Sequence, residues 1–163
     1  MQIDMDLYLK YLTDKFKSNG TFHLQTLLRN LYFDIVTGGV LLQGRCENLS
    51  DLRGSCDLAV NCTGLGARRL CDDKRVIPLR GQVLRVEAPW IKTALYADDV
   101  YIIPGQKWVT VGGTRQYNDW MTEVSPHDSA RIWARAAATF PTIAGAKVLE
   151  EKVGLRPHRH TVR

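Results

Sequence analysis

VYIIPGQKWVTVGGTRQYNDW, residues 100–120, is the stretch of this 163-residue sequence that decides its fold. Two strand-like runs, 100–103 and 108–111, are joined across a Pro-Gly pair and closed by two glycines, which predicts a β-hairpin. Antiparallel pairing then brings Tyr101 and Arg115 to the same end of a small sheet. A phenol beside a guanidinium suits an anion, although each residue alone is more often a half-buried tyrosine or an exposed arginine.

Composition sets broad limits on the function. The chain is 45% hydrophobic and 24% charged, as in an ordinary soluble domain, and carries a formal net charge of +5. The basic residues are scattered and lack interleaved aromatic platforms, so a nucleic-acid partner is not expected. No run approaches the ~20 apolar residues of a membrane span, and the acidic start is unlike a secretory signal. We therefore expect an intracellular protein with no membrane partner.

Cysteine and histidine spacing gives no metal site. The cysteines do not form CxxC pairs, so we expect reduced and mostly buried thiols. The histidines are either isolated or lie in a basic run without acidic company. The cysteines are Cys46, Cys56, Cys62 and Cys71, and the histidines are His23, His127, His158 and His160.

The spacing of apolar residues, the helix caps and the helix-breaking residues predict further helices and strands. Asp6 is expected to cap the first helix, and Ser125 to cap a later helix that has Pro126 in its first turn. The last strand is expected to end just before Arg156. The expected helices are 7–18, 48–52 and 126–140, and the expected strands are 40–43, 56–61 (buried), 78–87 and 147–155.

The turn after residue 61 resembles a dinucleotide-binding fingerprint in part. Gly64 and Gly66 follow a predicted strand and open a predicted helix. Arg69 stands where the third glycine belongs, so an NAD site is weakly supported. A tight strand-to-helix turn without a ligand is the alternative, and Gly64 allows close approach of the backbone to a ligand.

Several motifs in one order resemble the D-amino-acid oxidase family of FAD enzymes. The pieces are YIIPG, VTVGGTRQ and DW in the hairpin, with NCTGLGARRL at 61–70, PLRGQVLRVEAPW at 78–90 and EKVGLRPHR at 151–159. The GGTRQ form is similar to that of the aspartate-oxidising members. The resemblance implies an α/β (α+β) fold: part of a Rossmann-like FAD-binding domain (1–20 and 39–75), an expected insertion (21–38), a mostly antiparallel-sheet substrate domain (76–155) and a return segment (156–163).

The same resemblance implies roles for single residues. Arg156 would hold the substrate's α-carboxylate through two parallel hydrogen bonds, with the Tyr101 hydroxyl beside it, and Arg115 would take a side-chain carboxylate. A buried arginine facing a neutral side chain would lack a partner, so neutral D-amino acids should bind poorly. Cys46, Thr63 and Gly64 fall at the family's contacts with FAD. The loop before YIIPG departs from the neutral-acid members, so Tyr96 is left out of the site.

The implied reaction is oxidation of an acidic D-amino acid by FAD and molecular oxygen to a 2-oxoacid, ammonia and hydrogen peroxide. The family's amino-terminal glycine-rich turn and carboxyl-terminal flavin-covering segment have no match here, so we expect weak FAD binding and no activity from the chain alone. A neutral D-amino-acid oxidase and a non-catalytic truncated isoform stay open, as does a homo-oligomer. The family implies a peroxisomal location, or otherwise a cytoplasmic one.

Overall fold

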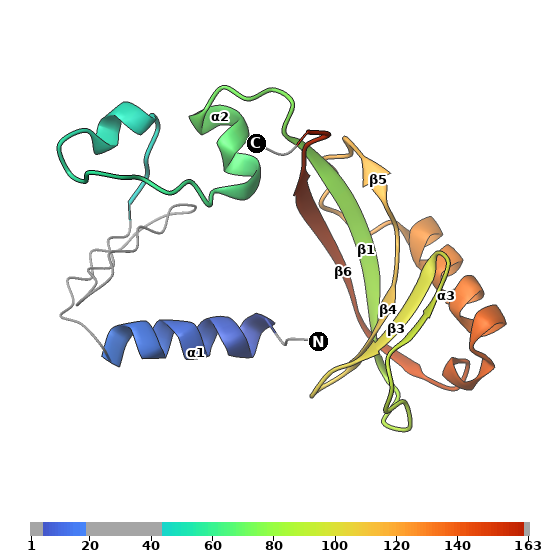
Figure 1. Ribbon diagram of the computed structural model, residues 1–163. Helices are drawn as coiled ribbons and strands as arrows, with labels where there is room; N and C mark the ends of the chain where they lie inside the picture. The colour runs from blue at the N-terminus through green and yellow to red at the C-terminus, as the bar shows by residue number, and fades with distance from the viewer. Residues whose placement is uncertain (1–4, 19–43, 162–163) are drawn as a thin grey trace. The chain divides into compact units, whose positions relative to one another are not determined.

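The computed structural model describes residues 5–18 and 44–161, and the chain divides into two compact units, residues 1–76 and 77–163 (Figure 1). The strand predicted at 40–43 and the insertion predicted at 21–38 lie outside the described residues.

The second unit is built on a six-stranded sheet in the order β2-β3-β4-β1-β5, with β6 paired to β1. Every pairing is antiparallel. The central strand β1 pairs with β4 and β5 along one edge and with β6 along the other. The strands are β1 (Ile77–Glu87), β2 (Leu95–Ala97), β3 (Val100–Pro104), β4 (Val109–Gly112), β5 (Gln116–Tyr117) and β6 (Lys147–His158). The predicted fold class, with a mostly antiparallel sheet, is confirmed.

The predicted hairpin is the β3–β4 pair. Tyr101 lies opposite Gly112 and Ile103 lies opposite Thr110. The buried residues Val109 and Val111 alternate with the half-buried Thr110, so one face of the hairpin is apolar, as the sequence predicted.

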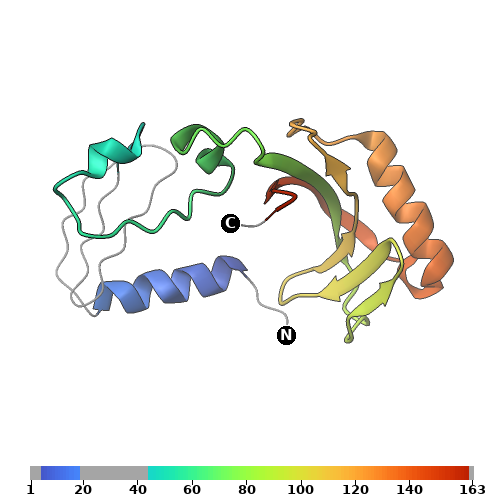
Figure 2. The ribbon, with the colours of Figure 1, turned by 45° about the horizontal axis from the view of Figure 1, so that its top comes forward.

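One face of this sheet is covered by helix α3, Pro126–Thr139 (Figures 1 and 2). Its cap is the predicted one: Ser125 Oγ accepts a hydrogen bond from the Asp128 amide at 3.3 Å, and Pro126 begins the helix. Ile132 and Ala136 are fully buried against the apolar side of the sheet, and the 3-10 helix η3, Pro141–Ile143, follows.

Alternation along β1 gives the sheet a closed face and an open face. Gln82, Leu84 and Val86 are at most 1% exposed on the α3 side, whereas Val83 and Arg85 between them are half-buried. Side chains on the open face are therefore available for a site, while those on the closed face build the core.

The described residues of the first unit form α1 (Met5–Ser18), η1 (Leu49–Leu52), η2 (Gly64–Gly66) and α2 (Ala67–Leu70). Helix α1 includes Met5, so Asp6 lies inside the helix and the predicted cap is wrong. The short helix predicted at 48–52 is η1. Its start is held by Asp51, whose carboxylate accepts from the backbone amides of Glu47 and Asn48.

Two further sequence predictions fail in this unit. Residues 56–61 form no strand and are all exposed. A buried strand needs hydrogen-bonded neighbours on both edges, and the described part of this unit supplies none. The cysteines also differ from the prediction. All four are free, but only Cys46 is buried, whereas Cys56, Cys62 and Cys71 are exposed, so the expectation of mostly buried thiols is wrong.

Candidate functional site

A pocket of about 320 Å³ opens on the sheet face opposite α3. It contains both predicted substrate-binding arginines and the predicted tyrosine, which come from three separate parts of the chain. Its lining consists of Leu79, Asp98, Asp99, Tyr101, Gly113, Thr114, Arg115 and Arg156. The structure thus brings Tyr101, Arg115 and Arg156 into one cavity, and their roles in binding stay predictions.

Arg156 lies within β6 rather than after it. The strand was predicted to end at residue 155, but it continues to His158, with Arg156 opposite Leu79 and Pro157 opposite Pro78. The guanidinium lies over the backbone of Gly81: a Cβ at that position would be only 2.7 Å from Cζ and from Nη2 of Arg156. Glycine at position 81 therefore leaves the space that the guanidinium occupies.

Tyr101 is placed in a similar way on β3. Its ring covers Gly112, the residue directly opposite, and a Cβ at Gly112 would overlap the ring. The hydroxyl is 3.0 Å from the position that a Cβ at Gly113 would take. Tyr96 lies across from Tyr101 on β2, but it is 69% exposed and does not belong to the described lining of the pocket.

Arg115 follows β4 and is held by its neighbours. The amide of Gln82 donates to Thr114 Oγ1 at 2.9 Å, and the Thr114 amide donates back to the Gln82 carbonyl at 3.3 Å. Gln116 then pairs with Arg80 in the sheet. Arg115 and Arg156 are both exposed. The expected buried arginine, which would lack a partner beside a neutral side chain, is therefore wrong for Arg115.

Two acidic residues of the pocket were missed by the sequence reasoning. Asp98 and Asp99 form the two-residue turn between β2 and β3, and Asp98 has a φ of 32°. Asp99 Oδ2 lies 3.5 Å from Arg135 Nη1, which draws that carboxylate toward α3. The signal in the sequence was the Asp-Asp pair between two short strand-like runs, which is typical of a hairpin turn.

The residues predicted to contact FAD belong to the first unit. Gly64 has a φ of 57° and opens the turn into α2, where its lack of a Cβ permits this backbone conformation. Thr63 donates from its amide and from Oγ1 to Asn61 Oδ1, at 3.1 and 2.7 Å. Glu47, beside the buried Cys46, pairs with Arg69 of α2 at 2.6 Å. That ion pair joins the two segments that carry these residues.

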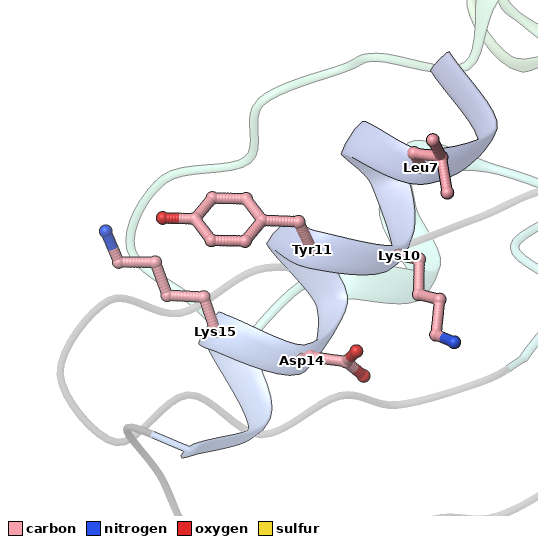
Figure 3. A pocket seen from close by; sticks show the side chains of 5 residues that line it. All are labelled: Leu7, Lys10, Tyr11, Asp14 and Lys15. Carbon is pink, nitrogen blue, oxygen red and sulfur yellow. The ribbon is translucent and has the colours of Figure 1, made fainter. Parts of the chain in front are cut away.

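A second hollow, of about 590 Å³, lies beside α1. Its described lining comes from this one helix, and all five side chains are exposed. Tyr11 and Lys15 point to one side of the helix while Lys10 and Asp14 point to the other (Figure 3). These groups do not converge on a common point, so the larger hollow is a weaker candidate than the pocket on the sheet.

Residues 5–18 and 44–161 contain no group of three or more His, Cys, Asp or Glu side chains placed to hold a metal ion. No helix in the described part of the chain is both long and apolar enough to cross a bilayer.

Comparison with known proteins gives consistent matches. The family model described as DAO, FAD dependent oxidoreductase, matches residues 1–162. The chain is 45% identical over 129 residues to D-aspartate oxidase of Homo sapiens, covering 78% of this chain and 38% of that protein. It is 40% identical over 147 residues to a D-amino-acid oxidase of Streptomyces coelicolor, covering 86% and 44%. The structure of glycine oxidase from Geobacillus kaustophilus matches with a TM-score of 0.56 and 26% identity over 61% of this chain and 29% of that one. The chain therefore spans less than half the length of these relatives.

Proposed function

Because the chain belongs to the DAO family of FAD-dependent oxidoreductases, we propose that it forms the substrate-binding part of an enzyme for acidic D-amino acids. The proposed reaction converts D-aspartate or D-glutamate into the 2-oxoacid, ammonia and hydrogen peroxide. The observation that carries the proposal is a single pocket lined by two guanidinium groups and one phenol.

Each group has a chemical task in this proposal. Arg156 binds the α-carboxylate through paired hydrogen bonds and Tyr101 donates its hydroxyl to the same group. Arg115 binds the second carboxylate. Two fixed cations for two anions restrict the substrate to one orientation, which is the protein's main contribution when the cofactor supplies the chemistry.

FAD would supply the oxidation chemistry of this reaction when bound. Within this chain, Cys46, Thr63 and Gly64 would contact it. Cys46 is the one buried residue among residues 44–75, so this part of the chain offers little packed surface to a cofactor. We expect the isolated chain to bind FAD weakly and to be inactive alone. Flavin absorbance in the purified protein tests this directly.

An oxidase of neutral D-amino acids is the second candidate. Asp98 and Asp99 line the same pocket as Arg115, so in this alternative their carboxylates would balance the charge of Arg115 when the substrate has no second carboxylate. The 3.5 Å pair between Asp99 and Arg135 argues against this, because it occupies one of the two carboxylates elsewhere. We therefore favour the acidic substrate.

The decisive experiment compares D-aspartate with D-2-aminobutyrate, which has a methyl group in place of the second carboxylate. Because the chain alone is expected to be inactive, the binding of both amino acids to the wild type and to Arg115→Leu is measured by NMR titration. We expect the wild type to prefer D-aspartate and the variant to lose that preference. Arg131→Leu, an exposed arginine on α3, is the matched control. A wild type that prefers the neutral amino acid would overturn the proposal.

Two further readouts separate the remaining alternatives. Peroxide release from D-aspartate with added FAD would contradict the expected inactivity of the chain alone and would exclude a non-catalytic truncated isoform. Size-exclusion chromatography tests the predicted homo-oligomer, for which the long edge strand β6 offers unpaired backbone groups. We also propose a peroxisomal site of action, which the position of a fluorescent fusion in cells would test.

A further inference from the structure

We propose that Arg80 is a positioning residue: its buried guanidinium fixes the segment that carries Arg115 and so sets the preference for a second carboxylate. This inference rests on the proposed function, in which Arg115 binds the side-chain carboxylate of the substrate. Arg80 does not line the pocket. It lies in β1 with its side chain on the closed face of the sheet and is fully buried.

Every N–H group of this guanidinium has an acceptor. Nη1 donates to Gln116 Oε1 at 2.6 Å and to Asp128 Oδ2 at 3.0 Å. Nη2 donates to Gln82 Oε1 at 3.0 Å and to the Glu123 carbonyl at 2.7 Å, and Nε donates to the Met121 carbonyl at 2.9 Å. Arginine presents five donors in a rigid planar fork, and no other side chain could satisfy this set.

The hydrogen bonds of Arg80 are linked to Arg115 through the two residues that flank Arg115 in the sequence. The side chain of Gln116 accepts a hydrogen bond from Arg80 through Oε1, and Gln116 Nε2 donates to Asp128 Oδ2 at 3.0 Å. Thr114 Oγ1 lies 3.2 Å from Gln116 Oε1 and accepts from the Gln82 amide. Both neighbours of Arg115 are therefore anchored to the same buried network, while Arg115 itself is exposed.

The network has little freedom to adjust. The Gln82 side-chain amide also donates to the Ser125 carbonyl at 2.8 Å and to Ser129 Oγ at 2.7 Å, at the start of α3. A buried polar network in which every member is satisfied has one favoured arrangement, because any shift leaves a desolvated group without a partner. The backbone at Arg115 inherits that single arrangement, so the exposed side chain enters the pocket from a fixed Cα position.

Two variants of the full chain separate positioning from general stability. Gln116→Met removes the three side-chain hydrogen bonds of Gln116, to Arg80, Thr114 and Asp128, at similar volume and leaves Arg80 paired with Asp128. Arg80→Lys keeps the charge but cannot reach five acceptors. Arg85→Lys is the matched control: it is the same substitution on the same strand, but Arg85 is on the open face, where it pairs with Glu150 at 2.8 Å and covers Trp108.

The measurement is the affinity for succinate relative to butyrate, which have the same carbon count and differ by one carboxylate. NMR titration of the folded chain gives both constants. We expect Gln116→Met and Arg80→Lys to weaken succinate binding about fivefold or more and butyrate binding less than twofold, a loss of charge-assisted hydrogen bonding at one end of the ligand. Arg85→Lys should leave the ratio unchanged.

An unchanged ratio in folded Gln116→Met protein would overturn the inference. Amide ¹⁵N order parameters of residues 114–116 provide a second readout, which should fall in Gln116→Met and not in Arg85→Lys. If the wild type does not prefer succinate, the proposed function fails. The order parameters still decide whether Arg80 fixes this segment, so the two failures are distinguishable.

Discussion

Gly81→Ala is predicted to disable carboxylate binding without disturbing the fold. The new Cβ would lie 2.7 Å from Cζ and Nη2 of Arg156, so the guanidinium must leave its place over β1. Only the flexible end of a side chain moves, and Ala in a strand interior is favoured over Gly by roughly 0.5–1 kcal/mol. We therefore expect the free energy of unfolding to change by less than about 1 kcal/mol.

The cost to binding is larger. Hydrogen bonds to charged groups contribute about 1.5–3 kcal/mol. Arg156 is exposed, and solvent screening places this pair at the lower end of that range. A loss of about 1.4 kcal/mol weakens binding about tenfold. Because Arg156 is assigned the carboxylate that succinate and butyrate share, both ligands should lose affinity equally, unlike the effect expected for Arg115.

Gly154→Ala is the matched control. Gly154 is paired with Gly81 across β1 and β6, and a Cβ there would have no atom within 4 Å. NMR titration should give wild-type constants for Gly154→Ala and weaker binding of both ligands for Gly81→Ala, while urea unfolding confirms that both variants are folded. Wild-type affinity in folded Gly81→Ala protein would refute the reasoning, because it would show that Arg156 does not bind the carboxylate from its place over Gly81.

Three other predictions follow from the structure. Tyr101→Phe removes one hydrogen bond worth about 1 kcal/mol, so calorimetry should give roughly fivefold weaker binding of succinate and butyrate alike; an effect on succinate alone would contradict the assignment of Tyr101 to the shared carboxylate. Ser125→Ala removes the acceptor for the Asp128 amide and should cost about 1 kcal/mol of stability, seen as a lower urea midpoint with an unchanged slope and restored by Ser125→Thr. Burial, with the Asp51 charge adding to it, raises the pKa of the Cys46 thiol, so Cys46 should react with iodoacetamide more slowly than the exposed Cys56. Faster labelling of Cys46 than of Cys56, measured by mass spectrometry, would contradict this. The raised pKa also means that the folded state holds the thiol proton more tightly than the unfolded state does. Its contribution to the free energy of unfolding is therefore complete below the ordinary thiol pKa and is lost as the pH rises through the pKa of the folded state.

Local patterns predicted much of the second unit because its elements carry their own signals. The hairpin was marked by alternation and glycines, and α3 by Ser125, Pro126 and the spacing of Ile132 and Ala136. The resemblance supplied the roles of Tyr101, Arg115 and Arg156. The register of β3 against β4 then placed Tyr101 and Arg115 at one end of the sheet, as the sequence predicted.

The failures arise where the structure depends on distant partners. Residues 56–61 carry a strand pattern, but a pattern does not supply neighbouring strands, and the segment is exposed. Arg80 was missed for a different reason. The alternation recognised for Leu84 and Val86 extends back to Gln82 and Arg80 on the same buried face. A charged residue at a core position of a strand is a signal for a buried polar network, and it was present in the sequence.

The two faces of β1 explain how an exposed site can be well ordered. Leu79 lies on the open face and lines the pocket, and Gly81 leaves room there for Arg156, while Arg80 and Gln82 are fully buried beneath α3. Exposed arginines ordinarily lose binding energy to side-chain entropy. Here the backbone on both sides of Arg115 is held from the opposite face, where the hydrogen bonds of Arg80 and Gln82 are shielded from water and cooperate. A variant that weakens the buried face should therefore reduce both stability and ligand selectivity, because it leaves buried polar groups without partners and releases the segment that carries Arg115. A destabilised but folded variant with wild-type selectivity would contradict this.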